Sequence, residues 1–158
     1  MKLRNYLSGT NGLTIIEVLL SLTILGIIVL GVMQFFTQAY SFTNSNQNKT
    51  VAINVARNAM MYMEKQNFIE TRENFKNHAS ASLFICHDEY QLVWSKETTP
   101  AGCTPISINN IDYNVTITST DEDNQSFMIP LAVKVGWEVN KKPDSTELKG
   151  ALKSEDIR

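Results

Sequence analysis

The stretch GLTIIEVLLSLTILGIIVLG, residues 12–31, decides the fold of this chain. The apolar run extends over residues 13–36, in which Glu17 is the only charged side chain. A helix needs about 20 predominantly apolar residues to cross a bilayer, whereas a secretory signal has an apolar part of only about 7–15 residues before a small-residue cleavage site. This run is too long for such a signal, and no clear A-x-A pattern follows it. We therefore expect residues 13–36 to form a transmembrane helix.

Glu17 is the unexpected residue in this helix. A carboxylate at the centre of a spanning helix costs about 2.5–3.5 kcal/mol on insertion scales, and less near an end. No Lys, Arg or His lies between Leu13 and Lys49, so the helix supplies no cationic partner. Two interpretations stay open: a carboxylate near the headgroups, or pairing with a new amine made by a cut before Leu13. That amine would belong either to the same chain or to a neighbouring one.

The N-terminal residues resemble the signature of type IV pilins and pseudopilins. In that family a short basic leader ends in Gly, followed by an apolar residue, often a Thr, and a Glu at the fifth mature position. Gly12, Leu13, Thr14 and Glu17 match this pattern position by position. There are two departures: Leu13 stands where Phe is commonest, and Gln34 stands where major pilins often carry a helix-bending proline.

The resemblance implies a maturation pathway and a role in assembly. Residues 1–12 would be a cytoplasmic leader, removed after Gly12 by a prepilin peptidase/methyltransferase that N-methylates Leu13. Glu17, together with Thr14, would act in assembly, with the Glu17 carboxylate pairing with the Leu13 amine of a neighbouring subunit. The basic side chains that precede the run place the N-terminus in the cytoplasm and the C-terminal part outside by the positive-inside rule.

The function implied is structural. The chain would be a minor pilin or pseudopilin, held in membrane lipid and then assembled into a type IV pilus-like filament at the surface or across the periplasm. Its partners would be other pilin subunits and an inner-membrane assembly platform. A pseudopilin of a competence DNA-uptake or type II secretion machine is an alternative within the same family. A membrane-anchored binding protein that never polymerises is an alternative from another class.

Residues 37–69 are expected to continue the helix in amphipathic form. Apolar side chains recur at helical spacing from residue 51 to residue 63, and the helix is expected to end near Phe68. They are Val51, Ala52, Val55, Ala56, Ala59, Met60, Tyr62 and Met63. The Asn- and Ser-rich residues 37–50 are mediocre helix formers, so a loosened turn there stays open.

Residues 70–158 are expected to form an extracytoplasmic β-rich domain. Alternation predicts strands at 90–95, 111–119 and 128–139 and a last strand at 147–152, with turns at 119–126 and 140–146. Pro130 favours the beginning or an edge of its strand. The predicted fold is therefore α+β, with a long N-terminal helix packed on a small antiparallel sheet, which is also the architecture that the pilin resemblance implies.

The two cysteines, Cys86 and Cys103, would lie outside the cytoplasm. A disulfide between them would close a loop of 18 residues and stabilise the fold by about 3 kcal/mol in the entropic model. Two free or buried thiols are the alternative.

Residue patterns for catalysis and for ligand binding are missing. The sequence has no P-loop, no G-x-S-x-G and no nucleophile–base pair, so we expect no enzyme and no cofactor. The CHDE stretch at 86–89 lacks the spacing of a metal site, and the acidic residues 121–123 lack that of a calcium loop. The basic residues Lys141, Lys142, Lys149 and Lys153 are diluted by nearby acids, and the net charge is −2, which argues against direct nucleic-acid binding.

Overall fold

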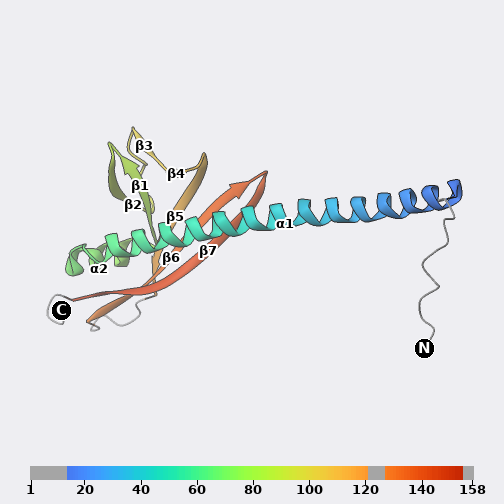
Figure 1. Cartoon of the computed structure of the whole chain (residues 1–158). Helices are drawn as coiled ribbons and strands as arrows, with labels where there is room; N and C mark the ends of the chain where they lie inside the picture. Colours follow the sequence, from blue (N-terminus) through green and yellow to red (C-terminus); the bar gives the residue numbers. More distant parts are fainter. Residues whose placement is uncertain (1–13, 121–126, 155–158) are drawn as a thin grey trace, which may run out of the picture. The chain divides into compact units, whose positions relative to one another are not determined.

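The computed structural model describes residues 14–120 and 127–154 and has the predicted α+β layout, a long N-terminal helix followed by a small antiparallel sheet (Figure 1). The chain divides into two compact units, Met1–Ser45 and Asn46–Arg158. The elements are α1 (Ile15–Met63), α2 (Phe68–Asn77), β1 (Ala81–Cys86), β2 (Glu89–Trp94), β3 (Cys103–Thr104), β4 (Ile106–Ile108), β5 (Ile111–Ser119), β6 (Met128–Val139) and β7 (Lys142–Lys153).

Helix α1 runs without a break through the Asn- and Ser-rich residues 37–50, so the loosened turn considered there is not present. Hydroxyl groups in this stretch bond to the helix's own backbone: Thr43 Oγ1 donates to the Ala39 carbonyl at 2.9 Å, and Thr50 Oγ1 donates to the Asn46 carbonyl at 2.9 Å. Each hydroxyl thus shares a carbonyl of the helix four residues earlier, so its hydrogen bond is made without interrupting the helix.

The end of α1 differs from the prediction. The helix stops at Met63 rather than near Phe68, and a second helix, α2, begins at Phe68. Asn67 is the cause, because its side-chain oxygen accepts hydrogen bonds from the backbone N–H groups of Ile69 (3.0 Å) and Glu70 (3.1 Å) and so caps a new helix. The expected amphipathic segment 37–69 therefore contains a helix boundary, and most of α2 lies inside the segment expected to be β-rich.

The sheet has the strand order β2-β1-β5-β6-β7, with β3 paired to β1 and β4 paired to β5, and every pairing is antiparallel. Three two-residue turns connect neighbouring strands, and both residues of each have positive φ, as type I′ hairpin turns require. These turns are His87–Asp88, Asn109–Asn110 and Asn140–Lys141.

The last of these turns corrects the expected turn at 140–146. Only Asn140 and Lys141 turn the chain, Val139 pairs with Lys142, and β7 then runs for 12 residues. The presence of Pro143 at its start made this part look like a loop. Pro143 lies in the edge strand, where a missing N–H breaks no ladder. Pro130 lies near the beginning of β6, as predicted, just beyond the last residue paired to β5.

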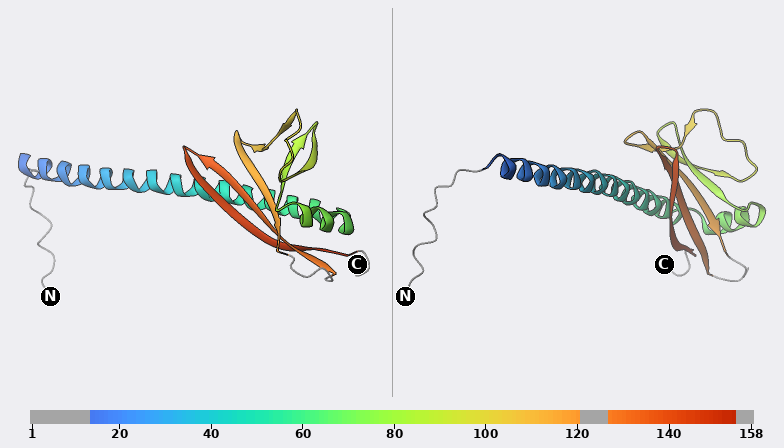
Figure 2. Two further views of the ribbon diagram at one scale, coloured as in Figure 1. Left: turned by 180° about the vertical axis from the view of Figure 1, so that it is seen from behind. Right: turned by 90° about the vertical axis from the view of Figure 1, so that its right-hand side faces the viewer.

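The core lies between one stripe of α1 and one face of the sheet, and the views in Figure 2 show the later part of α1 lying along strands β5–β7. The buried α1 residues are Ala52, Val55, Ala56, Ala59, Met60 and Met63, spaced for a single helix face. The alternate residues Tyr113, Val115 and Ile117 of β5 and Val133, Val135 and Trp137 of β6 face them. The predicted stripe is thus buried, with Val51 and Tyr62 partly covered at its margins.

Candidate functional site

The start of α1 carries the motif that the sequence singles out. Thr14 precedes the first helical residue, Ile15, and its Oγ1 accepts a hydrogen bond from the backbone N–H of Glu17 at 3.3 Å. The Thr14 carbonyl accepts from Glu17 N at 3.0 Å and from Val18 N at 3.2 Å. Thr14 is therefore the N-cap of α1, and Glu17 lies at the third helical position. This T-x-x-E spacing is that of a capping box, a local signal that the sequence analysis did not use.

The placement of Glu17 reduces the electrostatic cost of its charge. As an acid in the first helical turn it faces the positive end of the helix dipole, an interaction worth about 0.3–1 kcal/mol near a surface. A charge at a bilayer centre costs about 2.5–3.5 kcal/mol, so the dipole offsets only part of that cost. The location of Glu17 at the end of the helix lowers the cost more than the dipole does, because an end can lie outside the bilayer centre. Within residues 14–120 and 127–154, no hydrogen bond or ion pair engages the Glu17 carboxylate.

The structure thus brings Thr14 and Glu17 together at the start of α1. The other two residues of the motif, Gly12 and Leu13, lie outside the described residues. The cleavage and methylation expected at these two positions, and the assembly role expected for Glu17, are therefore carried into the proposal below.

The apolar part of α1 is solvent-exposed on all sides. Its large hydrophobic side chains from Ile15 to Phe42 are 43–82% exposed, and the most apolar 18-residue window has none of its residues buried. The helix is long and apolar enough to cross a membrane. Its hydroxyl groups need no outside partner: Ser21 donates to the Glu17 carbonyl at 2.8 Å and Thr23 donates to the Leu20 carbonyl at 2.7 Å. The helix therefore offers a surface suited to lipid or to other apolar helices.

A disulfide joins Cys86 and Cys103, with Cα atoms 4.2 Å apart. The two residues face each other in the β1–β3 pairing, and the adjacent pair Ile85 and Thr104 extends that ladder. The bond therefore ties the short strand β3, and the loop before it, to the end of β1. Cys86 is 5% exposed, so the sulfur linkage is largely shielded on that side.

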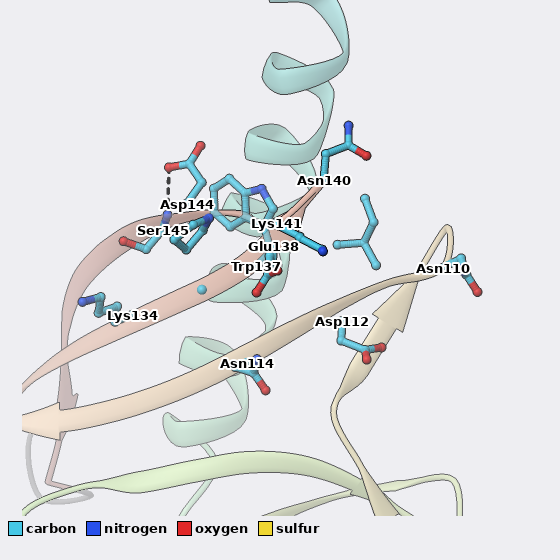
Figure 3. A pocket seen from close by; sticks show the side chains of 13 residues that line it. Asn110, Asp112, Asn114, Lys134, Trp137, Glu138, Asn140, Lys141, Asp144 and Ser145 are labelled. Carbon is cyan, nitrogen blue, oxygen red and sulfur yellow. Dashed lines mark hydrogen bonds between the residues drawn. The ribbon is translucent and has the colours of Figure 1, made fainter. Parts of the chain in front are cut away.

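A polar hollow lies along strands β5–β7, near the turns that end them (Figure 3). It encloses about 930 Å³, and Gly136 leaves room in it because it carries no side chain. Its charged lining includes Asp112, Lys134 and Glu138, so neither sign of charge dominates. Among the described residues, no group of three or more His, Cys, Asp or Glu side chains is placed to hold a metal ion. The acidic residues 121–123 lie outside those residues.

Comparisons with protein-family models, with curated proteins and with solved structures gave no match for this chain. The functional conclusion is therefore drawn from its residues and their geometry.

Proposed function

We propose that this chain is a minor pilin or pseudopilin, a structural subunit of a type IV pilus-like filament. It is cut after Gly12, N-methylated at Leu13, and held in the membrane by residues 13–36 with its N-terminus in the cytoplasm. The sheet domain lies on the other side of the membrane. The observation that supports this most is an exposed apolar helix that begins after the N-cap Thr14 and carries a carboxylate, Glu17, in its first turn.

The exposed surface of α1 has a use at each stage of this pathway. Lipid covers the apolar side chains while the subunit is in the bilayer, and neighbouring helices replace the lipid when the subunit is drawn into a filament. Because lipid tails are themselves apolar, that exchange is close to neutral in hydrophobic terms, and specific polar pairs then decide the register.

The pair that sets the register is Glu17 with the Leu13 amine of a neighbouring subunit. Cleavage before Leu13 makes a new ammonium group close to the N-terminus of α1, where the dipole of its own helix disfavours a positive charge. A carboxylate from outside the helix offsets that repulsion. Glu17 of a neighbouring subunit can supply it without leaving the first turn of its own helix.

A second candidate is a membrane-anchored binding protein that never polymerises. The hollow along β5–β7 is the observation that favours it, since small ligands bind in concave surfaces with convergent polar groups. The competence and secretion alternatives share the filament mechanism and differ only in the machine that the subunit serves. Direct DNA contact gains no support, because Glu147 lies 3.8 Å from Lys149 and dilutes the basic cluster.

The experiment that tests the proposal is quantitative mass spectrometry of the sheared cell-surface fraction. The expected result is a peptide that begins at N-methylated Leu13, at low abundance relative to other pilins. A dominant abundance would instead make the chain the main building block of the filament. Recovery of only the uncut chain, confined to the membrane, would refute the pilin proposal and leave the anchored binding protein.

A substitution at Glu17 tests the assembly role itself. Glu17→Ala should leave membrane insertion intact and sharply reduce the amount of the subunit in sheared filaments. The matched control is Gln34→Ala. Within residues 15–36 of the described structure, Gln34 is, besides Glu17, the polar side chain without a hydrogen bond to the helix backbone. Normal incorporation of the Glu17→Ala subunit would show that the carboxylate does not set the register.

A further inference from the structure

The aromatic side chains of α1 gather at one level of the helix. Phe35, Phe36, Tyr40 and Phe42 are each at least 65% exposed, whereas residues 15–34 contain no aromatic side chain at all. The chain has seven Phe and five Tyr in all, so a third of them lie within these eight residues. We call these four residues the aromatic collar.

The aromatic collar covers a wide part of the helix circumference. At about 100° per residue its side chains spread over roughly 160° of the helix circumference. That is wider than the seam of a two-helix coiled coil, which is narrower than the apolar face of about 100° or more on an ordinary amphipathic helix. The planar environment of a bilayer interface surrounds a helix on all sides. Tyr is enriched there because its amphipathic ring lies at the level of the headgroups. Phe is used at the boundary between headgroups and acyl chains by helices that bind membrane surfaces.

The spacing between the aromatic collar and Glu17 matches the thickness of a bilayer. Phe36 is 19 residues beyond Glu17 in the sequence, which is about 28 Å along a helix. The hydrocarbon core of a bilayer is about 30 Å thick, with headgroup regions of about 5–7 Å on each side. Tyr40, about 6 Å further along the helix, would then lie among the headgroups.

We propose that the aromatic collar binds the lipid headgroup interface and fixes the depth of α1, so that the Glu17 carboxylate lies at the opposite interface. The partner is the lipid surface, and the aliphatic residues between the two ends act as a spacer. This placement keeps the charge of Glu17 out of the hydrocarbon without a protein partner. The inference needs only insertion in a membrane and is independent of cleavage after Gly12.

The test measures the depth of two positions in the uncut full-length chain, reconstituted in phosphatidylcholine vesicles. The lipids carry bromine atoms, which quench tryptophan fluorescence, either close to the headgroups or close to the bilayer centre. One reporter is Tyr40→Trp, in the aromatic collar, and the matched reporter is Ile27→Trp, midway along the spacer. Fluorescence of the native Trp94 and Trp137, both in the sheet domain, is measured in the unsubstituted chain and subtracted.

The expected losses of fluorescence have opposite order at the two reporters. Shallow bromines should quench the Tyr40→Trp reporter more than deep ones, and deep bromines should quench the Ile27→Trp reporter more than shallow ones. If the Ile27→Trp reporter is deep but the Tyr40→Trp reporter is quenched mainly by deep bromines, or by neither kind, the collar proposal is wrong. If the Ile27→Trp reporter is quenched by neither, α1 is not in the bilayer, and the membrane stage of the proposed function fails as well.

A second variant tests whether the aromatic collar fixes the depth. Changing all four of its residues to Leu keeps the surface apolar but removes the rings, and the preference of the Ile27→Trp reporter for deep bromines should fall. The control changes four isoleucines of α1 outside the aromatic collar to Leu, namely Ile15, Ile16, Ile24 and Ile28, and should leave that preference unchanged. An unchanged depth in the variant without rings would refute the depth-fixing role.

Discussion

Reduction of the Cys86–Cys103 disulfide should lower the free energy of unfolding of the sheet domain by about 3 kcal/mol. The bond links residues 17 apart in sequence, and the entropic model assigns a crosslink over a loop of that size about 3 kcal/mol. In the folded chain the β1–β3 pairing, with Ile85 opposite Thr104, joins the same two strands as the bond. The loss therefore arises mainly because the reduced unfolded chain gains conformational freedom.

Urea unfolding of the full-length chain in detergent micelles measures this loss. Trp94 and Trp137 report on the sheet domain, since Trp137 is 4% exposed and Trp94 packs against Phe75 with ring centroids 4.9 Å apart. With a urea slope of about 1–3 kcal/mol per molar, the midpoint should fall by about 1–3 M on reduction. A midpoint that moves by less than about 0.3 M would refute the entropic argument at this site.

A cysteine-free variant separates the crosslink from the packing of the sulfur atoms. The variant with both Cys86→Ala and Cys103→Ala should lose the same free energy of unfolding as the reduced chain. It should also lose a smaller additional amount, because Cys86 is 5% exposed and its truncation leaves a small void. Reductant should have no effect on this variant. If it shifts the midpoint there too, the effect seen in the native chain does not come from the disulfide.

Three further predictions concern local features of the fold. Lys141→Gly should stabilise the sheet domain by about 1 kcal/mol in urea unfolding, because Lys141 has φ +62° in a turn where glycine pays no steric cost; equal or lower stability would refute this. Burial raises the pKa of Tyr113 above its ordinary value of 10.0, so its contribution to stability is complete below about pH 10 and lost as the pH rises further. Tyr113→Phe should reduce this loss of stability above about pH 10. An unchanged dependence of stability on pH would show that other groups cause the loss. Thr14→Val should destabilise the first turn of α1 by about 1 kcal/mol, seen as faster amide exchange at Glu17, while Thr14→Ser should not.

The regular parts of the fold could be predicted from periodicity in the sequence. Strands β5 and β6 have the expected bounds, because large apolar residues recur at every second position and are buried on the face under α1. The buried stripe of α1 was predicted for a similar reason, since Val55, Ala59 and Met63 recur at helical spacing. In both cases a single buried face imposes one clear period.

The elements that were missed are set by local hydrogen bonds or by strand pairing. Asn67 looks like an ordinary polar residue of a helix until its side chain is seen to cap α2. Strand β7 was underestimated because, as an edge strand, it buries only Leu152 completely and its first residues resemble a loop. The helical state of residues 37–50 goes against their intrinsic propensity, and composition alone could not decide it.

The candidate site was predicted from a motif and not from periodicity. Thr14 and Glu17 were found by motif, yet the physical link between them, the cap hydrogen bond at 3.3 Å, is a helix-start signal that does not depend on the family. The same T-x-x-E spacing would cap a helix in any protein. The match to the pilin signature is therefore partly a match to a good helix start, and the cut at Gly12 is what would distinguish the two.

Anchoring alone does not explain a carboxylate at position 17. Alanine there would enter a bilayer at least as readily and is a better helix former. The dipole of α1 stabilises the carboxylate by only about 0.3–1 kcal/mol. A location at the interface avoids the cost of burying the charge in hydrocarbon but adds no stabilising interaction. Apart from its contribution to the helix start, a stronger stabilisation of the carboxylate needs a cation, and residues 14–48 contain none. In the proposed function that cation is the Leu13 amine of a neighbouring subunit, and the Glu17→Ala subunit should therefore insert normally and fail at assembly.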